Sequence, residues 1–168
     1  MDDRKGIEPL LEALKLLKPD EQRAICLILG GPIKADFREK VELKIAEVGK
    51  DVQIVRSFGK IERRQVQVYF QLSDYILALY QNHVGMASVV VRAAVSGKPV
   101  LASDYGYLGH LVQSEQLGAV TDSTSPDAIR ALLERMLTEE LPYSKTNLQK
   151  LADRNSEVYF AETIFYHL

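Results

Sequence analysis

Residues 75–103 read YILALYQNHVGMASVVVRAAVSGKPVLAS and carry the pattern that decides the fold. YILALY (75–80) is a short apolar run typical of a buried strand, and residues 87–96 read as a helix. Glycine often follows the last turn of a helix, so Gly97 is expected to end this one. PVLAS, which begins at Pro99, reads as a second strand. A strand, a helix and a strand in this order predict two parallel strands joined by a crossover.

The same alternation extends over the rest of the chain. Apolar residues at helical spacing predict a first helix, which Pro19 ends: Ile7, Leu10, Leu11, Leu14 and Leu17. AICLIL (24–29), closed by two glycines and a proline, reads as a parallel strand buried on both faces. Further strands are expected at 52–58 and 118–120, and a linker at 137–144. Further helices are expected at 35–49, 62–72, about 106–115, from Ser125 onward, 144–154 and 156–167. We therefore predict an α/β fold in one domain, a Rossmann-like parallel sheet with helices on both faces that closes with C-terminal helices.

The composition is that of an ordinary globular protein. The 168 residues include 21 Lys and Arg against 23 Asp and Glu, so there is no basic excess to suit nucleic acid. We expect no nucleic-acid partner, no transmembrane segment and a cytoplasmic location, because no apolar run is long enough to span a membrane and MDDRKG lacks the apolar core of a signal peptide. Cys26, the only cysteine, is expected to be a small buried hydrophobe.

A binding site is expected at the carboxyl ends of the predicted strands. Ligands of open parallel sheets bind there, where the N-termini of helices direct partial positive charge at anions. Four loops would meet at this edge, those at Gly30–Gly31, Ser57–Gly59, 80–88 and 103–107.

Five segments in a fixed order carry a resemblance to a known family. They are DRKGIEPLLEALKLL, LILGGP, SFGKI, GMASVVVRAAVSGKPVLASDYGYLGHLV and TDSTSPDAIRALLERML. Together, over about residues 3–166, the chain resembles the second, donor-binding domain of GT-B glycosyltransferases, most closely the glycosyl transferases group 1. The resemblance implies a nucleoside diphosphate sugar as donor. It also implies that these 168 residues are a fragment that lacks the acceptor-binding N-terminal domain and the first strand of the second domain; a natural stand-alone domain is the alternative.

The resemblance also implies which residues contact the donor. Lys5 matches the lysine of the family that binds the diphosphate, although a solvated lysine is the alternative. The others are the glycine after the first strand, the loop beside the base, the 83–88 loop and one residue after a later strand: Gly31; Ser57, Phe58, Gly59 and Lys60; His83, Gly85, Met86, Ala87 and Ser88; and Asp104. Ser88 could instead cap the helix that follows, and His83 could be a loop residue without a role.

Two positions depart from the family pattern. The family usually carries two glutamates eight positions apart, one near the sugar hydroxyls and one on the ribose, and these positions are Val84 and Arg92 here. Valine accepts no hydrogen bond and a guanidinium only donates. Arg92 could reach the diphosphate, could pair with Asp104 or Asp74 as a structural ion pair, or could reflect a shifted substrate such as an anionic sugar.

The expected function follows from these residues. The chain would bind the donor for glycosyl transfer, with Lys5 and the 85–88 amides stabilising the departing diphosphate. We expect no metal ion or other cofactor, since no His, Cys and Asp cluster has ligand spacing. The alternative is a non-catalytic nucleotide-binding or protein-interaction module on the same scaffold, which the loss of both glutamates would favour.

Overall fold

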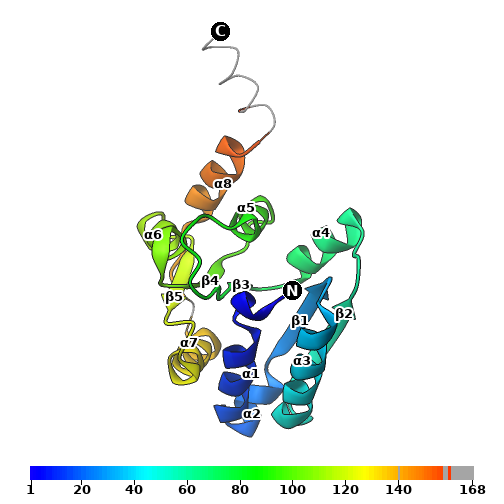
Figure 1. Cartoon of the computed structure of the whole chain (residues 1–168). Helices are drawn as coiled ribbons and strands as arrows, with labels where there is room; N and C mark the ends of the chain where they lie inside the picture. The colour runs from blue at the N-terminus through cyan, green and yellow to red at the C-terminus, as the bar shows by residue number, and fades with distance from the viewer. Residues whose placement is uncertain (140, 157–158, 160–168) are drawn as a thin grey trace.

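The computed structural model describes residues 1–139, 141–156 and 159, and in these residues strands and helices alternate along the chain (Figure 1). The strands are β1 (Cys26–Gly31), β2 (Gln53–Phe58), β3 (Ile76–Ala78), β4 (Val100–Ser103) and β5 (Gly118–Thr121). The helices are the 3-10 helix η1 (Asp3–Lys5), α1 (Ile7–Leu16), α2 (Pro19–Arg23), α3 (Ala35–Val48), α4 (Arg63–Leu72), α5 (Ser88–Val95), α6 (Gly106–Ser114), α7 (Pro126–Thr138) and α8 (Lys145–Arg154).

All strand pairs are parallel, and they form two sheets. β1 pairs with β2, and β4 lies between β3 and β5. Cys26 lies opposite Gln53 in the first sheet, and Val100 lies between Ile76 and Gly118 in the second. The predicted α/β class with parallel strands is confirmed, whereas the single continuous sheet is replaced by two within the described residues.

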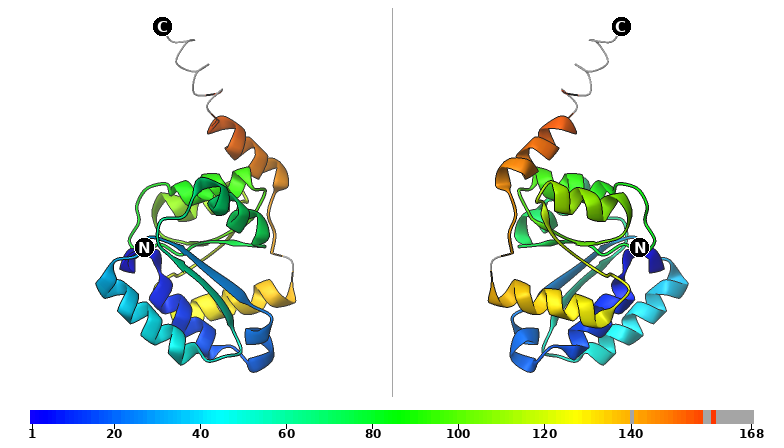
Figure 2. Two further views of the ribbon diagram at one scale, coloured as in Figure 1. Left: turned by 90° about the vertical axis from the view of Figure 1, so that its right-hand side faces the viewer. Right: turned by 90° about the vertical axis from the view of Figure 1, so that its left-hand side faces the viewer.

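Helices cover both faces of the strands (Figure 2). α1, α3 and α7 lie on one side, and α1 packs against both of the others. α4, α5 and α6 lie on the opposite side, and α8 packs on α5. Two apolar cores result: one is centred on α1 with Leu11 and Leu14, and the other on α5 and α6 with Val90 and Leu108.

The expectation that the first strand is buried on both faces is wrong. Leu27 and Leu29 are buried in the core beneath α1, while Cys26 and Gly30 on the opposite face are exposed. Side chains alternate along a strand, so burial on both faces needs a helix on each. α4 covers the second face sparsely and buries none of its own residues, which leaves Cys26 exposed rather than buried as predicted.

Most element boundaries agree with the sequence pattern to within a few residues. The strand expected at 75–80 is shorter, because Tyr80 donates its amide to Ala78 and leaves the ladder. η1 and α2 were not predicted, and α7 continues to Thr138, into the expected linker. The closing helix expected at 156–167 lies, apart from residues 156 and 159, outside the described residues.

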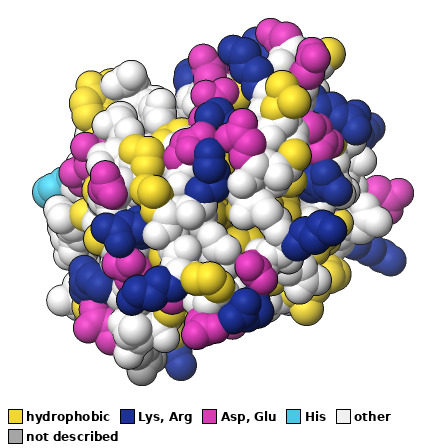
Figure 3. All heavy atoms as spheres, turned by 90° about the horizontal axis from the view of Figure 1, so that it is seen from below, with side chains coloured by type: hydrophobic (Ala, Val, Ile, Leu, Met, Phe, Trp, Pro, Cys, Tyr) yellow, Lys and Arg dark blue, Asp and Glu magenta, His cyan; other side chains and the backbone are white. Residues whose placement is uncertain are grey.

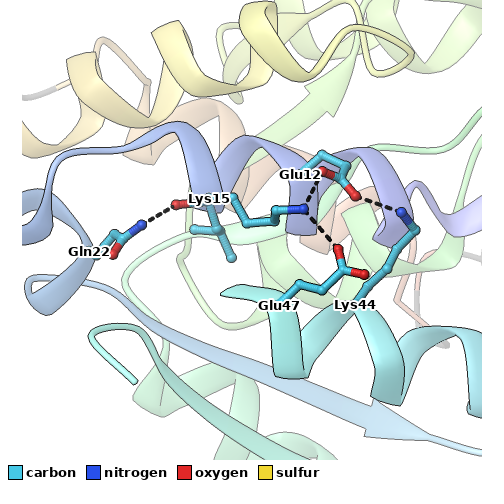
Figure 4. Close-up of polar contacts among 6 residues, drawn as sticks. Glu12, Lys15, Gln22, Lys44 and Glu47 are labelled. Atoms are coloured by element: carbon cyan, nitrogen blue, oxygen red, sulfur yellow. Dashed lines mark hydrogen bonds and ion pairs between the residues drawn. The ribbon is translucent and has the colours of Figure 1, made fainter. Parts of the chain in front are cut away.

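An ion-pair network joins α1 to α3 (Figure 4). Glu12 binds Lys44 at 2.6 Å and Lys15 at 3.0 Å, and Lys15 also binds Glu47 at 2.8 Å. Seen from below the view of Figure 1, basic and acidic side chains are interspersed over the surface (Figure 3). This face therefore shows no large patch of one sign of charge.

Candidate functional site

The N-terminal segment lies across the carboxyl ends of β1 and β3. The amino group of Met1 donates to the carbonyl oxygen of Pro32, just after β1, and the amide of Gln81, just after β3, donates to the carbonyl oxygen of Arg4 at 2.9 Å. Because the strands of each sheet are parallel, their carboxyl ends lie at the same edge of that sheet. The N-terminal segment contacts this edge in both sheets. The four predicted loops therefore do come to one side of the molecule.

Lys5 lies at this edge, next to the end of β3. Its ammonium lies 4.0 Å from the centre of the Tyr80 ring, and its side chain is exposed. Arg4 is paired with Asp2 at 2.8 Å, and this hydrogen bond holds the pKa of the Asp2 carboxyl below its ordinary value. Within the described residues Lys5 has no carboxylate partner of its own, so its charge is available to an anion.

Tyr80 links Lys5 to the loop that follows β3. The rings of Tyr80 and His83 meet edge to face at a centroid distance of 5.3 Å, and His83 Nε2 lies 3.3 Å from the carbonyl oxygen of Met86. The structure thus brings together Lys5, His83 and Met86, all predicted site residues. Tyr80 itself was missed, because its only signal in the sequence is its place at the end of an apolar run.

The loop after β3 presents five consecutive backbone amides without an acceptor in the described part of the chain, those of residues 85–89. The first bond of α5 is donated by Val90 to Ala87, the residue before the helix. No side chain caps this helix, so the alternative that Ser88 is its cap is wrong. Unpaired amides at a helix N-terminus bind anions readily.

Two glycines shape the neighbouring loop, which follows β4 and packs against this one. Tyr107 donates its amide to the carbonyl oxygen of Val84 at 2.9 Å. Gly106 has a left-handed φ of 66°, and a Cβ there would lie 2.8 Å from the carbonyl oxygen of His83. A Cβ at Gly109 would overlap the backbone of Asp104. Both glycines need their small size. Gly106 fixes the loop after β4 against the loop after β3, and Gly109 lets the first turn of α6 pack on the backbone of Asp104.

Two buried serines lie behind these loops and were also missed. Ser123 Oγ lies 3.0 Å from Ser103 Oγ and 3.3 Å from the carbonyl oxygen of Tyr80. The Gln81 side chain donates to the backbone of Ser123, and Asp104 donates its amide to Thr121. This network ties the ends of β3, β4 and β5 together and leaves the Asp104 side chain exposed at the edge.

The remaining predicted residues lie at the ends of β1 and β2. Gly31, Ser57 and Phe58 are the last residues of these strands, and Gly59 donates its amide to Gly31 at 3.3 Å. The guanidinium of Arg38 lies 5.6 Å from the centre of the Phe58 ring. Four basic residues lie between positions 56 and 64. Arg56 pairs with Glu42 at 2.7 Å. The other three have no ion pair among the described residues: Lys60, Arg63 and Arg64.

Arg92 is exposed on α5 and makes no ion pair with any described residue. Neither Asp74 nor Asp104 lies within ion-pair distance of it, so the structural ion pair considered as one explanation is not formed. Val84, at the other departure from the family pattern, exposes 68% of its surface. Both side chains are therefore open to a ligand.

No group of three or more His, Cys, Asp or Glu side chains that could hold a metal ion occurs in the described residues. No helix in the same part of the chain is long and apolar enough to cross a membrane.

Comparison with known proteins identifies the family. The family described as glycosyl transferases group 1 matches residues 1–156. The chain belongs to this family. A D-inositol 3-phosphate glycosyltransferase of Jonesia denitrificans is 25% identical over 134 residues, which are 77% of this chain and 31% of that protein.

Solved structures of glycosyltransferases share the fold. The Anabaena protein HepE in complex with UDP has a TM-score of 0.75 at 20% identity, covering 98% of this chain and 46% of HepE. The C-terminal domain of the glycosyl transferase group 1 protein LpcC of Francisella tularensis has a TM-score of 0.71 at 18% identity, covering 91% of this chain and 78% of that one. The chain thus spans less than half of the inositol-phosphate glycosyltransferase and of HepE, and has the GT-B fold of a C-terminal domain.

Proposed function

We propose that this chain is the donor-binding half of a glycosyltransferase and binds a nucleoside diphosphate sugar at the carboxyl edge of its strands. The proposal rests on the ammonium of Lys5, which lies at the same edge as the five amides of residues 85–89; none of these groups has a hydrogen-bond or ion-pair partner among the described residues. The departing group in this reaction is a nucleoside diphosphate, whose negative charge grows as the sugar leaves. HepE, which shares the fold, is seen in complex with UDP and with UDP-glucose.

The rest of the site would hold the nucleotide and the sugar. Ser57, Phe58 and Gly59 would border the base, with Lys60 near the phosphates, while His83 and Asp104 would lie beside the sugar. Gly31 ends β1 with a φ of 126° and has open space where a Cβ would stand, so a ligand could approach its backbone. Because Lys5 and the helix amides supply positive charge, the proposal needs no metal ion.

We further propose that this unit works in a longer chain with an acceptor-binding N-terminal domain and one more strand before residue 1. The tethers of residues 1–5 to Pro32 and Gln81 place that end of the chain between β1 and β3, whose facing edges pair with nothing in the described residues. A parallel strand there would join the two sheets into one. A cytoplasmic location is part of the same proposal, and the 168 residues alone would bind nucleotide without transferring sugar.

The test is calorimetric titration of the chain with UDP, GDP, ADP and CMP. We expect one diphosphate to bind, and Lys5→Ala to weaken it about tenfold, the effect of losing one charge-assisted contact. Lys145→Ala is the matched control, because this lysine begins α8 rather than lying at the carboxyl edge. Robust transfer by the isolated chain, or binding that Lys5→Ala leaves unchanged, would contradict this assignment.

A second candidate function is a non-catalytic module on the same scaffold. It is favoured by one observation, the replacement of the two usual carboxylates by Val84, which is largely exposed, and Arg92. The titration separates the donor-binding unit from a protein-interaction module, which would bind none of the nucleoside diphosphates. A non-catalytic nucleotide-binding module would bind one of them, and would be separated by a lack of sugar transfer in the longer chain.

A further inference from the structure

The segment from β3 to β4 has an unusual charge distribution. Residues 75–103 contain no aspartate or glutamate, and Arg92 and Lys98 are their only Lys or Arg residues. Lys98 follows α5 and lies at the amino end of β4, the edge opposite to the candidate site. Arg92 is therefore the one full positive charge that this segment can offer to a ligand near the 85–89 amides.

The position of Arg92 on α5 directs it toward these amides. Ser88, Arg92 and Val95 are spaced four and three residues apart, so they share one face of the helix, and all three are exposed. Arg92 lies one turn beyond Ser88, about 6 Å along the axis. Side chains of a helix lean toward its N-terminus, so we expect the guanidinium of Arg92 to lean toward the turn that carries the free amides.

Nothing in the described structure occupies this guanidinium. It has no carboxylate partner, and no ring lies within stacking distance, unlike Arg38 on Phe58. A planar fork of donors suits two phosphate oxygens at once, which an ammonium cannot match. The adjoining position, Val84, offers no acceptor for sugar hydroxyls.

We propose that Arg92 is a specificity-determining residue that binds the phosphates of the nucleotide and makes the site select a diphosphate over a monophosphate. This inference rests on the proposed function, since it assigns one more residue to the same site. The site would therefore recognise its ligand by phosphate charge at a position where a carboxylate would recognise hydroxyl groups.

The experiment is calorimetric titration with UDP, UMP and uridine, using the diphosphate of the best-bound base if another base binds more tightly. We expect Arg92→Ala to weaken the diphosphate about ten- to a hundredfold, the range of a charge-assisted bidentate contact, and to weaken the monophosphate less. Arg92→Lys keeps the charge but loses the fork, and should fall between the two. Lys98→Ala, a cation of the same segment at the opposite edge, is the control and should change binding less than about twofold.

The outcomes separate the two proposals. If the parent chain binds the diphosphate and Arg92→Ala binds it equally well, the role of Arg92 is wrong and the donor site remains. If Arg92→Ala and Lys98→Ala weaken binding equally, the effect is one of overall charge and the role of Arg92 is also wrong. If the folded parent chain binds no diphosphate of any base, the donor site itself is refuted together with this inference.

Discussion

At the scale of single residues, Gly6 sets the position of Lys5. Its φ of 67° lies in the left-handed region, and a Cβ at this residue would overlap the carbonyl oxygen of Leu79, the residue after β3. The close approach brings the start of α1 against β3 and places Lys5 over Tyr80. Lys5 is thus positioned by its glycine neighbour, for a reason that a single sequence does not display.

Gly6→Ala should therefore lower the free energy of unfolding more than Gly97→Ala. Gly97 has nearly the same φ, 66°, but a Cβ there would meet open space. Its substitution by alanine should lower the free energy of unfolding only by the cost of holding alanine in the left-handed conformation, about 1–2 kcal/mol. Gly6→Ala adds the overlap with Leu79 and should cost about 3 kcal/mol or more. Urea unfolding of the two variants measures the difference, and equal losses would show that the contact with Leu79 is relaxed at little cost.

At the scale of helices and strands, α5 and α7 begin in different ways. Ser125 caps α7 by accepting a hydrogen bond from the amide of Ala128 at 3.2 Å. The amides of Ser88 and Val89, the first two of α5, have no acceptor in the part of the chain that the structure describes, and Ser88 is exposed. A helix start that leaves its donors free gives up stability that a cap would supply. A bound anion would restore it, which fits the function proposed for this loop.

Substitution by alanine should affect stability differently at the two serines. Ser125→Ala should lower the free energy of unfolding by about 1 kcal/mol, because a cap is lost. Ser88→Ala should change it by less than about 0.5 kcal/mol, because an exposed side chain without a partner is removed. Thermal or urea unfolding without ligand provides the comparison, and a loss at Ser88 as large as at Ser125 would mean that Ser88 does cap α5 in solution.

The α1–α3 network should make stability depend on pH. Hydrogen bonds from Lys44 and then Lys15 hold the pKa of Glu12 below its ordinary value of 4.5. A lowered folded-state pKa contributes stability above the unfolded-state pKa, and this is lost as the pH falls through the folded-state value. Glu12→Gln should therefore lower the free energy of unfolding at pH 7 by up to about 1 kcal/mol, and the difference from the parent should vanish in acid.

Unfolding curves from pH 7 down to pH 3 would measure this effect. Glu139→Gln is the control, because Glu139 makes an exposed pair within one helix turn, with Arg135 at 2.6 Å. That variant should show no measurable change at either pH. A Glu12→Gln difference that persists undiminished at pH 3 would mean that the loss at pH 7 does not come from the charge of Glu12.

At the scale of the whole molecule, the alternation of strands and helices was predictable, but the way they are covered was not. The strand, helix and strand within residues 75–103 were predicted correctly. They could be predicted because the length of an apolar run and a glycine after a helix are local signals in the sequence. The exposure of Cys26 depends on how far α4 extends over β1, which no local signal encodes. The contact of Lys5 with Tyr80 likewise joins segments far apart in the sequence.

Binding of a nucleoside diphosphate at the carboxyl edge can be measured residue by residue by nuclear magnetic resonance of the isotope-labelled chain, titrated with UDP, GDP and ADP. We expect one of these nucleotides to shift the backbone amide signals of residues 85–89 and 57–59 together with Gly31, while those of α8 and of Lys98 at the opposite edge stay in place. Shifts confined to residues away from the carboxyl edge, or no shift with any diphosphate, would contradict this expectation.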